Sequence, residues 1–388
     1  MKKTIFKYLK RILFALLIIF PIIIYIGYSL GARVHYGDDP LALNWHNDGP
    51  YIFLENDSIL KVNYIKGNHD EGYYLEQKEY PFDSLVSAKC YYPMDSSSFG
   101  FQIRTSFQTP NSTYDDQNKI FAISDIESNY KTFRDFLINS KVIDKNLNWT
   151  FGSAHLVLVG DFVDRGQFTT QTLWFIYKLE QEAEKQGGSV HFIIGNHELK
   201  NMHGNYGAAA PKYTEIASIL NKELIELYDP SSIIGRWMAS KNAIELINGN
   251  LFVHGGIHPD LADANLSLEE INHIIRNNYY QPFEPTGNQD DLLTSTKTGP
   301  CWYRGYFKDD LAQQEIENGL DRFNAKTVIV GHTLQSEVNR QYNGKVIAID
   351  VHHPKDDHKN WPEGKSEALL IDGDKLYRVF ANGDKEEI

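Results

Sequence analysis

Residues 156–166 read LVLVGDFVDRG, and this stretch joins an apolar run to a cluster of charged residues. The run 156–159 has no polar side chain, which is typical of a strand buried on both faces of a sheet. Asp161, Asp164 and Arg165 follow it at once. Loops at the carboxyl ends of such strands carry the binding groups of α/β proteins. The stretch therefore predicts a buried strand that ends in a functional loop.

Four further blocks repeat this arrangement along the chain. They read SDIE at 124–127, GNHE at 195–198, HGG at 254–256 and GHT at 331–333, and they follow the apolar runs 120–123, 192–194, 251–253 and 328–330. Apolar residues between the blocks also show helical spacing, for example in 130–137 and 173–179. This alternation predicts an α/β core whose strand ends gather metal-binding side chains in one cleft.

The side chains of these blocks suit two divalent metal ions that act on a phosphate ester. Two ions roughly 3.5–4 Å apart can activate a bridging water and neutralise the phosphoryl oxygens. We expect Asp161 to bridge the two ions, because a carboxylate has two oxygens. Asp125 and Glu127 complete the first metal site, since side chains at i and i+2 of extended backbone point to one side. The second metal site takes Asn196, His254 and His332, a nitrogen-rich set that suits Mn, Fe or Zn.

The five blocks resemble those of the calcineurin-like metallophosphoesterases, and especially those of the phosphoprotein phosphatase family, whose pattern is GDxHG, GDxxDRG, GNHE, HGG and GH(T). The match runs from about residue 121 to residue 333. The resemblance implies a sandwich of two mixed β-sheets flanked by helices. Two further stretches, NMHG at 201–204 and GPCWYR at 299–304, are similar to the Shewanella-like bacterial branch of these phosphatases.

The resemblance also implies roles for individual residues. His197 resembles the general acid beside the leaving oxygen, with Asp164 orienting it. Arg165 resembles the arginine that binds the substrate phosphate, and Arg304 matches a second such arginine. Arg236, in the stretch 235–237, is a further candidate for phosphate binding. A guanidinium suits all three assignments because its planar fork of N–H groups matches phosphate oxygens.

The chain departs from the family pattern at Glu127, where the family has a histidine. Ser124 and Ser128 also replace glycines of the pattern. With Glu127 as a ligand the first site becomes all-carboxylate, which favours Mn or Mg over Zn. The cofactors we expect are therefore two divalent ions, with Mn favoured and Fe, Zn or Mg as alternatives. In the rival interpretation Glu127 does not bind metal, and one ion is weakly held or absent.

The N-terminus predicts a membrane anchor. Residues 1–11 carry four lysines and one arginine, and residues 12–30 form an uncharged apolar stretch. About 20 apolar residues can cross a bilayer as a helix, and the basic flank marks its cytoplasmic end. We expect a single-pass protein whose catalytic domain lies outside the cytoplasm, in the periplasm or an equivalent compartment. The alternative is a cleaved signal peptide and a secreted form, although residues 29–32 match a cleavage site poorly.

The rest of the chain divides into two predicted parts. Residues 38–110 read as a β-rich lead-in, and residues 119–381 as the catalytic domain. Turn dipeptides at 248–249, 343–344 and 372–373 separate β-type runs and predict hairpins. The stretch GNHD at 67–70 nearly copies the GNHE block, but it lies within the lead-in, and we interpret it as a hairpin turn.

The net charge and the cysteine content argue against one class of binding partner and two kinds of cysteine site. The formal net charge is −13, which argues against a nucleic-acid partner, because a duplex binder needs a basic face. The chain has only two cysteines, Cys90 and Cys301, which form neither a disulfide framework nor a thiolate metal site. They could pair in an oxidising compartment or stay as buried thiols.

These observations predict a metal-dependent phosphoesterase that hydrolyses phosphomonoesters by attack of a metal-bridging hydroxide. The resemblance favours phosphorylated Ser, Thr or Tyr side chains of proteins as the substrate. Small phosphoesters are a second possible substrate class. An alternative is a nucleotide or dinucleoside polyphosphate hydrolase, since such enzymes share the metal blocks. A rival from another class, prompted by Glu127, is a phosphate-binding module without catalysis.

Overall fold

The computed structural model describes residues 2–29, 32–308 and 311–388. Met1 of the predicted basic segment and Leu30 at the end of the predicted membrane span lie outside the described residues.

The core consists of two six-stranded mixed sheets. The first sheet has the strand order β10-β9-β8-β17-β18-β19, and the second has the order β14-β15-β13-β12-β11-β7. The first comprises β8 (Ile120–Ile123), β9 (His155–Val159), β10 (Ser189–Ile193), β17 (Glu367–Asp372), β18 (Lys375–Phe380) and β19 (Lys385–Glu387). The second comprises β7 (Thr113–Tyr114), β11 (Ile244–Ile247), β12 (Asn250–Val253), β13 (Thr327–Val330), β14 (Asn339–Gln341) and β15 (Val346–Ala348).

The inner faces of the two sheets pack against each other. Ala122, Val157 and Ile193 of the first sheet share a buried apolar cluster with Phe252 and Ile329 of the second. Alternate side chains of each strand point inward, as in other face-to-face sheet pairs. The predicted sandwich of two mixed sheets is confirmed.

Both parallel and antiparallel pairings occur within the two sheets. The strands that precede the functional blocks pair in parallel, β8 with β9, β9 with β10, and β12 with β13. The three predicted hairpins join β11 to β12, β14 to β15 and β17 to β18. Asn248 and Gly249 both have positive φ, which the tight turn between β11 and β12 requires. The first sheet continues to Glu387, beyond the predicted limit at residue 381.

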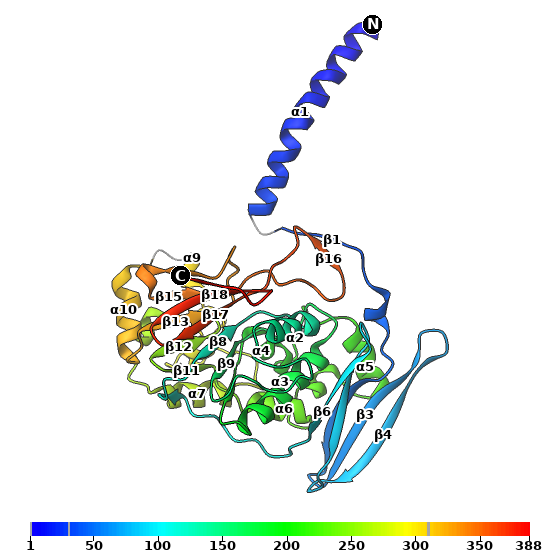
Figure 1. The fold of residues 1–388 in the computed structure, drawn as a ribbon, viewed down its shortest axis with the longest axis vertical. Helices are drawn as coiled ribbons and strands as arrows, with labels where there is room; N and C mark the ends of the chain where they lie inside the picture. Colours follow the sequence, from blue (N-terminus) through cyan, green and yellow to red (C-terminus); the bar gives the residue numbers. More distant parts are fainter. Residues whose placement is uncertain (1, 30–31, 309–310) are drawn as a thin grey trace.

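The helices of the body are α2 (Tyr130–Asn139), α3 (Thr169–Glu184), α4 (Asn196–Met202), α5 (Lys212–Ile219), α6 (Ile233–Ala239), α7 (Leu268–Asn277), α8 (Asp291–Thr294), α9 (Gly305–Lys308) and α10 (Gln313–Arg322). Helix α3 is buried along nearly its whole length. In Figure 1 the helices α2, α3, α4 and α6 lie between the strands of the sandwich and the long hairpin of β3 and β4.

The segment 38–110 is rich in strands and packs on α3. It contains β2 (Asp48–Glu55), β3 (Ile59–Asn68), β4 (Gly72–Pro81), β5 (Ser87–Tyr92) and β6 (Ser97–Gln102). The rings of Phe101 and Trp174 stack with centroids 4.6 Å apart, and the buried pair of Asp48 and Lys212 ties β2 to α5. Residues 67–70 lie at the turn between β3 and β4, so the hairpin interpretation of the GNHD stretch is confirmed.

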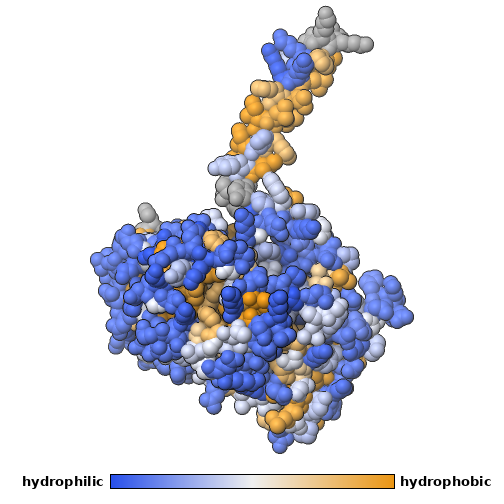
Figure 2. Space-filling model, viewed as in Figure 1, coloured by the Kyte–Doolittle hydropathy of each residue, from blue (hydrophilic) through white to orange (hydrophobic). Residues whose placement is uncertain are grey.

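Helix α1 (Lys2–Ser29) projects away from the body (Figure 1). Its part Ile5–Gly27 has a mean hydropathy of 2.4, and none of it is buried against the protein. By length and composition this helix can cross a membrane, and an N-terminal signal sequence would have the same character. Figure 2 shows it as an apolar rod on a largely polar body. A short ribbon of β1 (Val34–Tyr36) and β16 (Lys359–Trp361) follows it.

Candidate metal centre and active site

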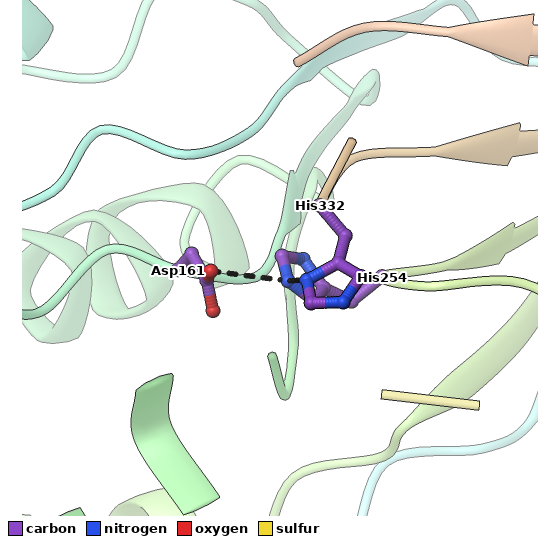
Figure 3. A group of neighbouring side chains, drawn as sticks. All are labelled: Asp161, His254 and His332. Atoms are coloured by element: carbon purple, nitrogen blue, oxygen red, sulfur yellow. Dashed lines mark hydrogen bonds and ion pairs between the residues drawn. The ribbon is translucent and has the colours of Figure 1, made fainter. Parts of the chain in front are cut away.

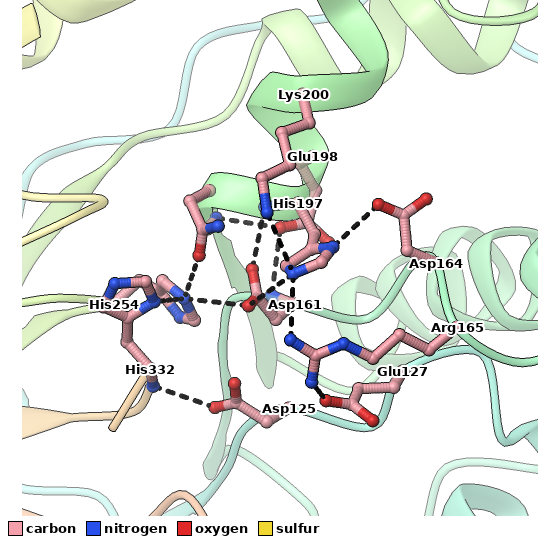
Figure 4. Close-up of polar contacts among 12 residues, drawn as sticks. Asp125, Glu127, Asp161, Asp164, Arg165, His197, Glu198, Lys200, His254 and His332 are labelled. Atoms are coloured by element: carbon pink, nitrogen blue, oxygen red, sulfur yellow. Dashed lines mark hydrogen bonds and ion pairs between the residues drawn. The ribbon is translucent and has the colours of Figure 1, made fainter. Parts of the chain in front are cut away.

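The five blocks meet at the carboxyl ends of the central strands (Figure 4). Asp125 follows β8, Asp161 follows β9, and His332 follows β13. All three have φ between 54° and 64°, a left-handed conformation that costs free energy in residues other than glycine. Asp164 and Arg165 share this conformation. Such strain gathers at functional sites, where the surrounding structure holds it in place.

Asp161, His254 and His332 form a buried cluster of potential metal ligands (Figure 3). One ligand atom from each lies within 4.8 Å of the others. The Nε2 atom of His254 is 3.2 Å from Oδ2 of Asp161 and 3.1 Å from Nδ1 of His332. The two imidazole rings face the carboxylate from neighbouring strands. This spacing fits one shared divalent cation.

Asn196 adds a fourth donor to this cluster. Its amide oxygen lies 3.1 Å from Nε2 of His254, and the same end of the amide faces Asp161 and His332. Lone pairs of oxygen and nitrogen that converge on one point repel one another unless a proton or a cation lies between them. The donor set of two imidazoles, an amide oxygen and a carboxylate therefore fits a metal ion.

Surrounding groups hold these donors in place. The Nδ1 atom of His254 lies 2.7 Å from the carbonyl oxygen of Val159, which turns Nε2 toward the cluster. The backbone N–H of His332 donates to Oδ2 of Asp125 over 3.1 Å. The buried Glu198 accepts three backbone N–H bonds, from Gly195, Asp161 and Phe162, at 2.8–3.0 Å. The loops after β9 and β10 are thereby fixed to each other.

Burial and neighbouring charges shift the pKa values of the ionisable side chains in and beside this cluster. Burial raises the pKa of Asp125 to about 6. Burial alone would lower the pKa of His254, but the attraction of Asp161 raises it to about 10. Burial and the neighbouring His254 lower the pKa of His332 to about 2. A protonated His254 thus supplies the positive charge among these carboxylates that a metal ion would bring.

His197 and Asp164 lie beside the cluster as a buried pair. Nδ1 of His197 is 2.7 Å from Oδ2 of Asp164, and Asn201 donates to the other carboxylate oxygen over 2.8 Å. Nε2 of His197 lies 3.3 Å from the Arg165 guanidinium and 3.3 Å from Nζ of Lys200. Figure 4 shows the imidazole between Asp164 and Arg165. Nε2 of His197 therefore lies beside two cationic side chains.

A cleft of about 390 Å³ opens onto Asn196 and His332. Its lining includes the cations Lys200, Lys297, Arg304 and Lys308. Arg304 donates to the carbonyl oxygen of His332, and to Oγ1 of Thr333 over 3.3 Å. Since the whole chain is strongly acidic, this concentration of cations suits an anionic substrate.

Glu127 points away from the histidine cluster. One oxygen of its carboxylate accepts from Arg165 and the other from Lys355. The side chains of Glu127 and Lys355 are only 14% and 15% exposed. Burial, together with the nearby Arg165, lowers the pKa of Lys355 to about 8. The carboxylate that the sequence places in the first metal site is thus engaged by two cations.

The structure does not bring Arg236 to the cleft. This arginine lies on α6, and its guanidinium binds the carbonyl oxygen of Pro230 and the carboxylate of Asp57. Asp57 belongs to the turn between β2 and β3, so Arg236 joins α6 to the lead-in strands.

Sequence reasoning missed Asp350, Lys355 and Glu198. Asp350 is buried close to Asp125 and Asp161, and its pKa is raised well above the ordinary value by burial and by Asp125. A signal for it was present, because the apolar run 346–349 ends in this aspartate, as the other strands end in their blocks. Lys355 has no such signal in the sequence.

Comparison with known proteins places these features in a family. The family model for the calcineurin-like phosphoesterases matches residues 118–336. The chain is 26% identical over 339 residues to Shewanella-like protein phosphatase 2 of Arabidopsis thaliana, covering 75% of this chain and 82% of that protein. It is 29% identical over 246 residues to Shewanella-like protein phosphatase 1 of Plasmodium berghei, covering 60% and 66%. The crystal structure of a cold-active protein-tyrosine phosphatase of a psychrophilic Shewanella species superposes with a TM-score of 0.76 at 30% identity, covering 88% of this chain and 98% of the other.

Proposed function

Because the chain belongs to the calcineurin-like phosphoesterases, we propose that it is a protein phosphatase that removes phosphate from Ser, Thr or Tyr side chains of proteins. Members of this family hydrolyse phosphate esters with a dinuclear metal centre. The observation that carries the proposal is the convergence of Asp161, Asn196, His254 and His332 beside the pair of His197 and Asp164. The names of the similar phosphatases favour phosphoprotein as the substrate.

The proposed metal ions would be held by residues of the five blocks. Asp161, Asn196, His254 and His332 would bind one ion, and Asp161 and Asp125 would contribute to the other. When bound, the ions supply Lewis-acid activation of water and neutralise charge on the phosphoryl group. Mn is the metal we propose, with Fe, Zn or Mg as alternatives, because the donors mix carboxylate, amide and imidazole.

The remaining steps use side chains of this chain. Arg165 and Arg304 would orient the phosphate through their guanidinium groups. His197 would donate the proton on Nε2 to the leaving oxygen as the ester bond breaks. Asp164 would accept from Nδ1 and so keep the imidazole correctly turned. Lys200, 3.3 Å from Nε2 of His197, would add positive charge beside the leaving group.

Substrate class is tested by comparing substrates on the full-length protein in detergent with Mn²⁺. Phosphopeptides that carry phosphoserine, phosphothreonine or phosphotyrosine are compared with ATP and a dinucleoside tetraphosphate. We expect a higher kcat/KM for at least one phosphopeptide than for either nucleotide. A preference for the nucleotides at every concentration would contradict the protein phosphatase proposal.

We also propose that α1 anchors the protein in a membrane with the catalytic body outside the cytoplasm. The basic residues at its N-terminal end and the apolar part Ile5–Gly27 support this orientation. No nucleic-acid partner is proposed, since the chain carries a net charge of −13. A C-terminal reporter that is active only outside the cytoplasm tests the orientation, and a cytoplasmic signal would refute it.

A further inference from the structure

We propose that one face of the ribbon formed by β1 and β16 lies in the interfacial zone of the membrane that α1 spans, in contact with lipid headgroups and the upper parts of the acyl chains. The inference rests on the proposed anchoring by α1, and it adds a second place at which the protein meets the bilayer. It does not depend on which side of the membrane the body occupies.

The two faces of the ribbon carry different side chains. Val34 pairs with Trp361, and Tyr36 pairs with Lys359. Residues paired across two strands lie on the same face, and so do alternate residues of one strand. One face therefore carries an aliphatic side chain, two aromatic rings and one ammonium group, those of Val34, Tyr36, Trp361 and Lys359. We call it the aromatic face, and none of its four side chains is acidic.

The opposite face of the ribbon packs toward the body. The ring of His35 stacks on that of His358 with centroids 3.9 Å apart, and the His358 side chain is only 14% exposed. By contrast, Val34, Tyr36 and Trp361 are 58%, 49% and 55% exposed. The aromatic face is thus apolar and largely uncovered by the parts of the chain that the structure describes.

Exposed apolar side chains are concentrated in this part of the molecule. Apart from α1, eight large hydrophobic side chains are exposed among the described residues, and five of them belong to residues 34–43 or to Trp361. The other three are scattered along the chain, at Tyr74, Leu85 and Leu334. Single exposed apolar residues are normal on a protein surface, whereas a concentration of them marks a site of contact with a partner or a membrane.

The end of α1 brings the ribbon to the membrane surface. The N–H of Ala32 donates to the carbonyl oxygen of Gly27 over 2.8 Å, and Gly27 ends the apolar part of the helix. Val34 follows two residues after Ala32, a path of at most about 7 Å. The interfacial zone on each side of the hydrocarbon core is roughly 5–8 Å thick. The ribbon therefore begins in or beside this zone, and Figure 1 shows it at the end of the body from which α1 projects.

The composition of the aromatic face fits this zone. Trp and Tyr are enriched where a membrane meets water, because the apolar ring and the polar N–H or O–H group each find a suitable environment there. A lysine keeps its ammonium group at the headgroups while its methylene stem lies against apolar surface. The bilayer is also the partner that lies next to this face whenever α1 spans it.

Quenching of tryptophan fluorescence by brominated lipid tests the inference. Helix α1 has no tryptophan, so this quenching reports on the body and not on the span. The full-length protein is reconstituted into phosphatidylcholine vesicles whose acyl chains are unbrominated, brominated near the headgroup, or brominated near the methyl ends. The emission of Trp361 is the difference between the unchanged protein and Trp361→Phe. We expect bromine near the headgroup to quench about half of this emission, and bromine near the methyl ends to quench less.

Trp45→Phe is the matched control for the loss of a tryptophan. The ring of Trp45 is 8% exposed and stacks on Tyr73 in the lead-in. The emission lost on bromination should be unchanged in Trp45→Phe and absent in Trp361→Phe.

A charge on the aromatic face gives a second variant that keeps Trp361. Val34→Asp should lower the quenching by at least about 2-fold, because a carboxylate resists transfer into an apolar environment. Leu85→Asp, at an exposed residue outside the ribbon, should leave the quenching unchanged. All variants should float with the vesicles in a density gradient, because α1 still anchors them.

The outcomes separate the ribbon from the anchor. Protein that floats with the vesicles but has the same emission with and without bromine would overturn the inference and leave the anchoring by α1 intact. Quenching that persists in Trp361→Phe would overturn it as well. An unquenched Trp361 together with a disulfide-linked dimer of Trp361→Cys would assign the face to a second copy of the chain instead. Protein that does not float would refute the anchoring and the inference with it, and phosphatase activity enters none of these measurements.

Discussion

Nδ1 of His197 lies 2.7 Å from Oδ2 of Asp164, and both side chains are buried. The opposite nitrogen of the imidazole lies 3.3 Å from both the Arg165 guanidinium and Nζ of Lys200, and Lys200 lines the cleft. One carboxylate thus determines which nitrogen of His197 presents a proton to a bound substrate. This relationship supports general acid catalysis and leads to the first prediction.

Asp164→Asn should lower kcat by about 100-fold for phenyl phosphate, because proton donation by a positioned side chain contributes about that factor. The loss should be much smaller for p-nitrophenyl phosphate, whose leaving group needs less help from an acid. Steady-state kinetics on both substrates provide the measurement. Equal losses on the two substrates would argue against an acid role for the pair.

Glu127→Gln should tighten inhibition by inorganic phosphate by about 3- to 10-fold. Glu127 competes with phosphate for Arg165, and its removal also takes away a negative charge close to the phosphate. The inhibition constant of phosphate is measured for this variant and for Asp357→Asn as the control. A weaker inhibition in Glu127→Gln alone would mean that Glu127 orients Arg165 for phosphate instead of competing with it.

Glu198→Gln should destabilise the fold by about 2–3 kcal/mol, because Glu198 accepts three backbone N–H bonds inside the protein. A glutamine offers one oxygen, and its NH₂ would face backbone donors. Urea unfolding of this variant is compared with that of Glu269→Gln, which changes an exposed residue of α7. Similar unfolding free energies for both variants would contradict the structural role of Glu198.

Asp356 should make stability depend on pH. Burial raises its pKa in the folded protein to about 6, whereas an unfolded aspartate titrates near about 4. Between these values the folded state binds more protons than the unfolded state, so the free energy of unfolding falls as pH rises from 4 to 6. The loss is complete above pH 6 and amounts to about 1–2 kcal/mol, because the side chain is partly exposed.

Urea unfolding of the unchanged protein and of Asp356→Asn between pH 4 and 7 measures this effect. The unchanged protein should lose stability relative to the variant as pH rises through the window. Asp374→Asn, in the exposed turn between β17 and β18, should show no such trend. A constant difference between the unchanged protein and Asp356→Asn would rule out the raised pKa.

Much of the fold was predictable because short stretches of sequence show both where a buried strand ends and which side chains follow it. Apolar runs such as 156–159 predict buried strands, and the residues that follow them meet because parallel strands share an edge. The hairpin turn at Asn248 and Gly249 is equally local, since it depends on backbone conformations that these two residue types tolerate.

The orientation of Glu127 was not predictable, because it depends on Lys355, which lies 228 residues further along the chain. The expectation that Arg236 binds the substrate phosphate failed for a different reason. Its residue type suits a phosphate, but α6 directs it toward Asp57 at the lead-in. Asp350 was within reach of sequence reasoning, yet a single aspartate after a short apolar run is too common a pattern to single out.

The dinuclear metal centre is the central claim, and hydrolysis of p-nitrophenyl phosphate tests it most directly. The full-length protein is assayed after EDTA treatment and again after Mn²⁺ is restored, in parallel with Asp161→Asn. We predict that turnover disappears with EDTA, returns with Mn²⁺, and is at least about 1000-fold lower in Asp161→Asn under all conditions. Turnover that persists in EDTA, or that survives in Asp161→Asn, would contradict the account.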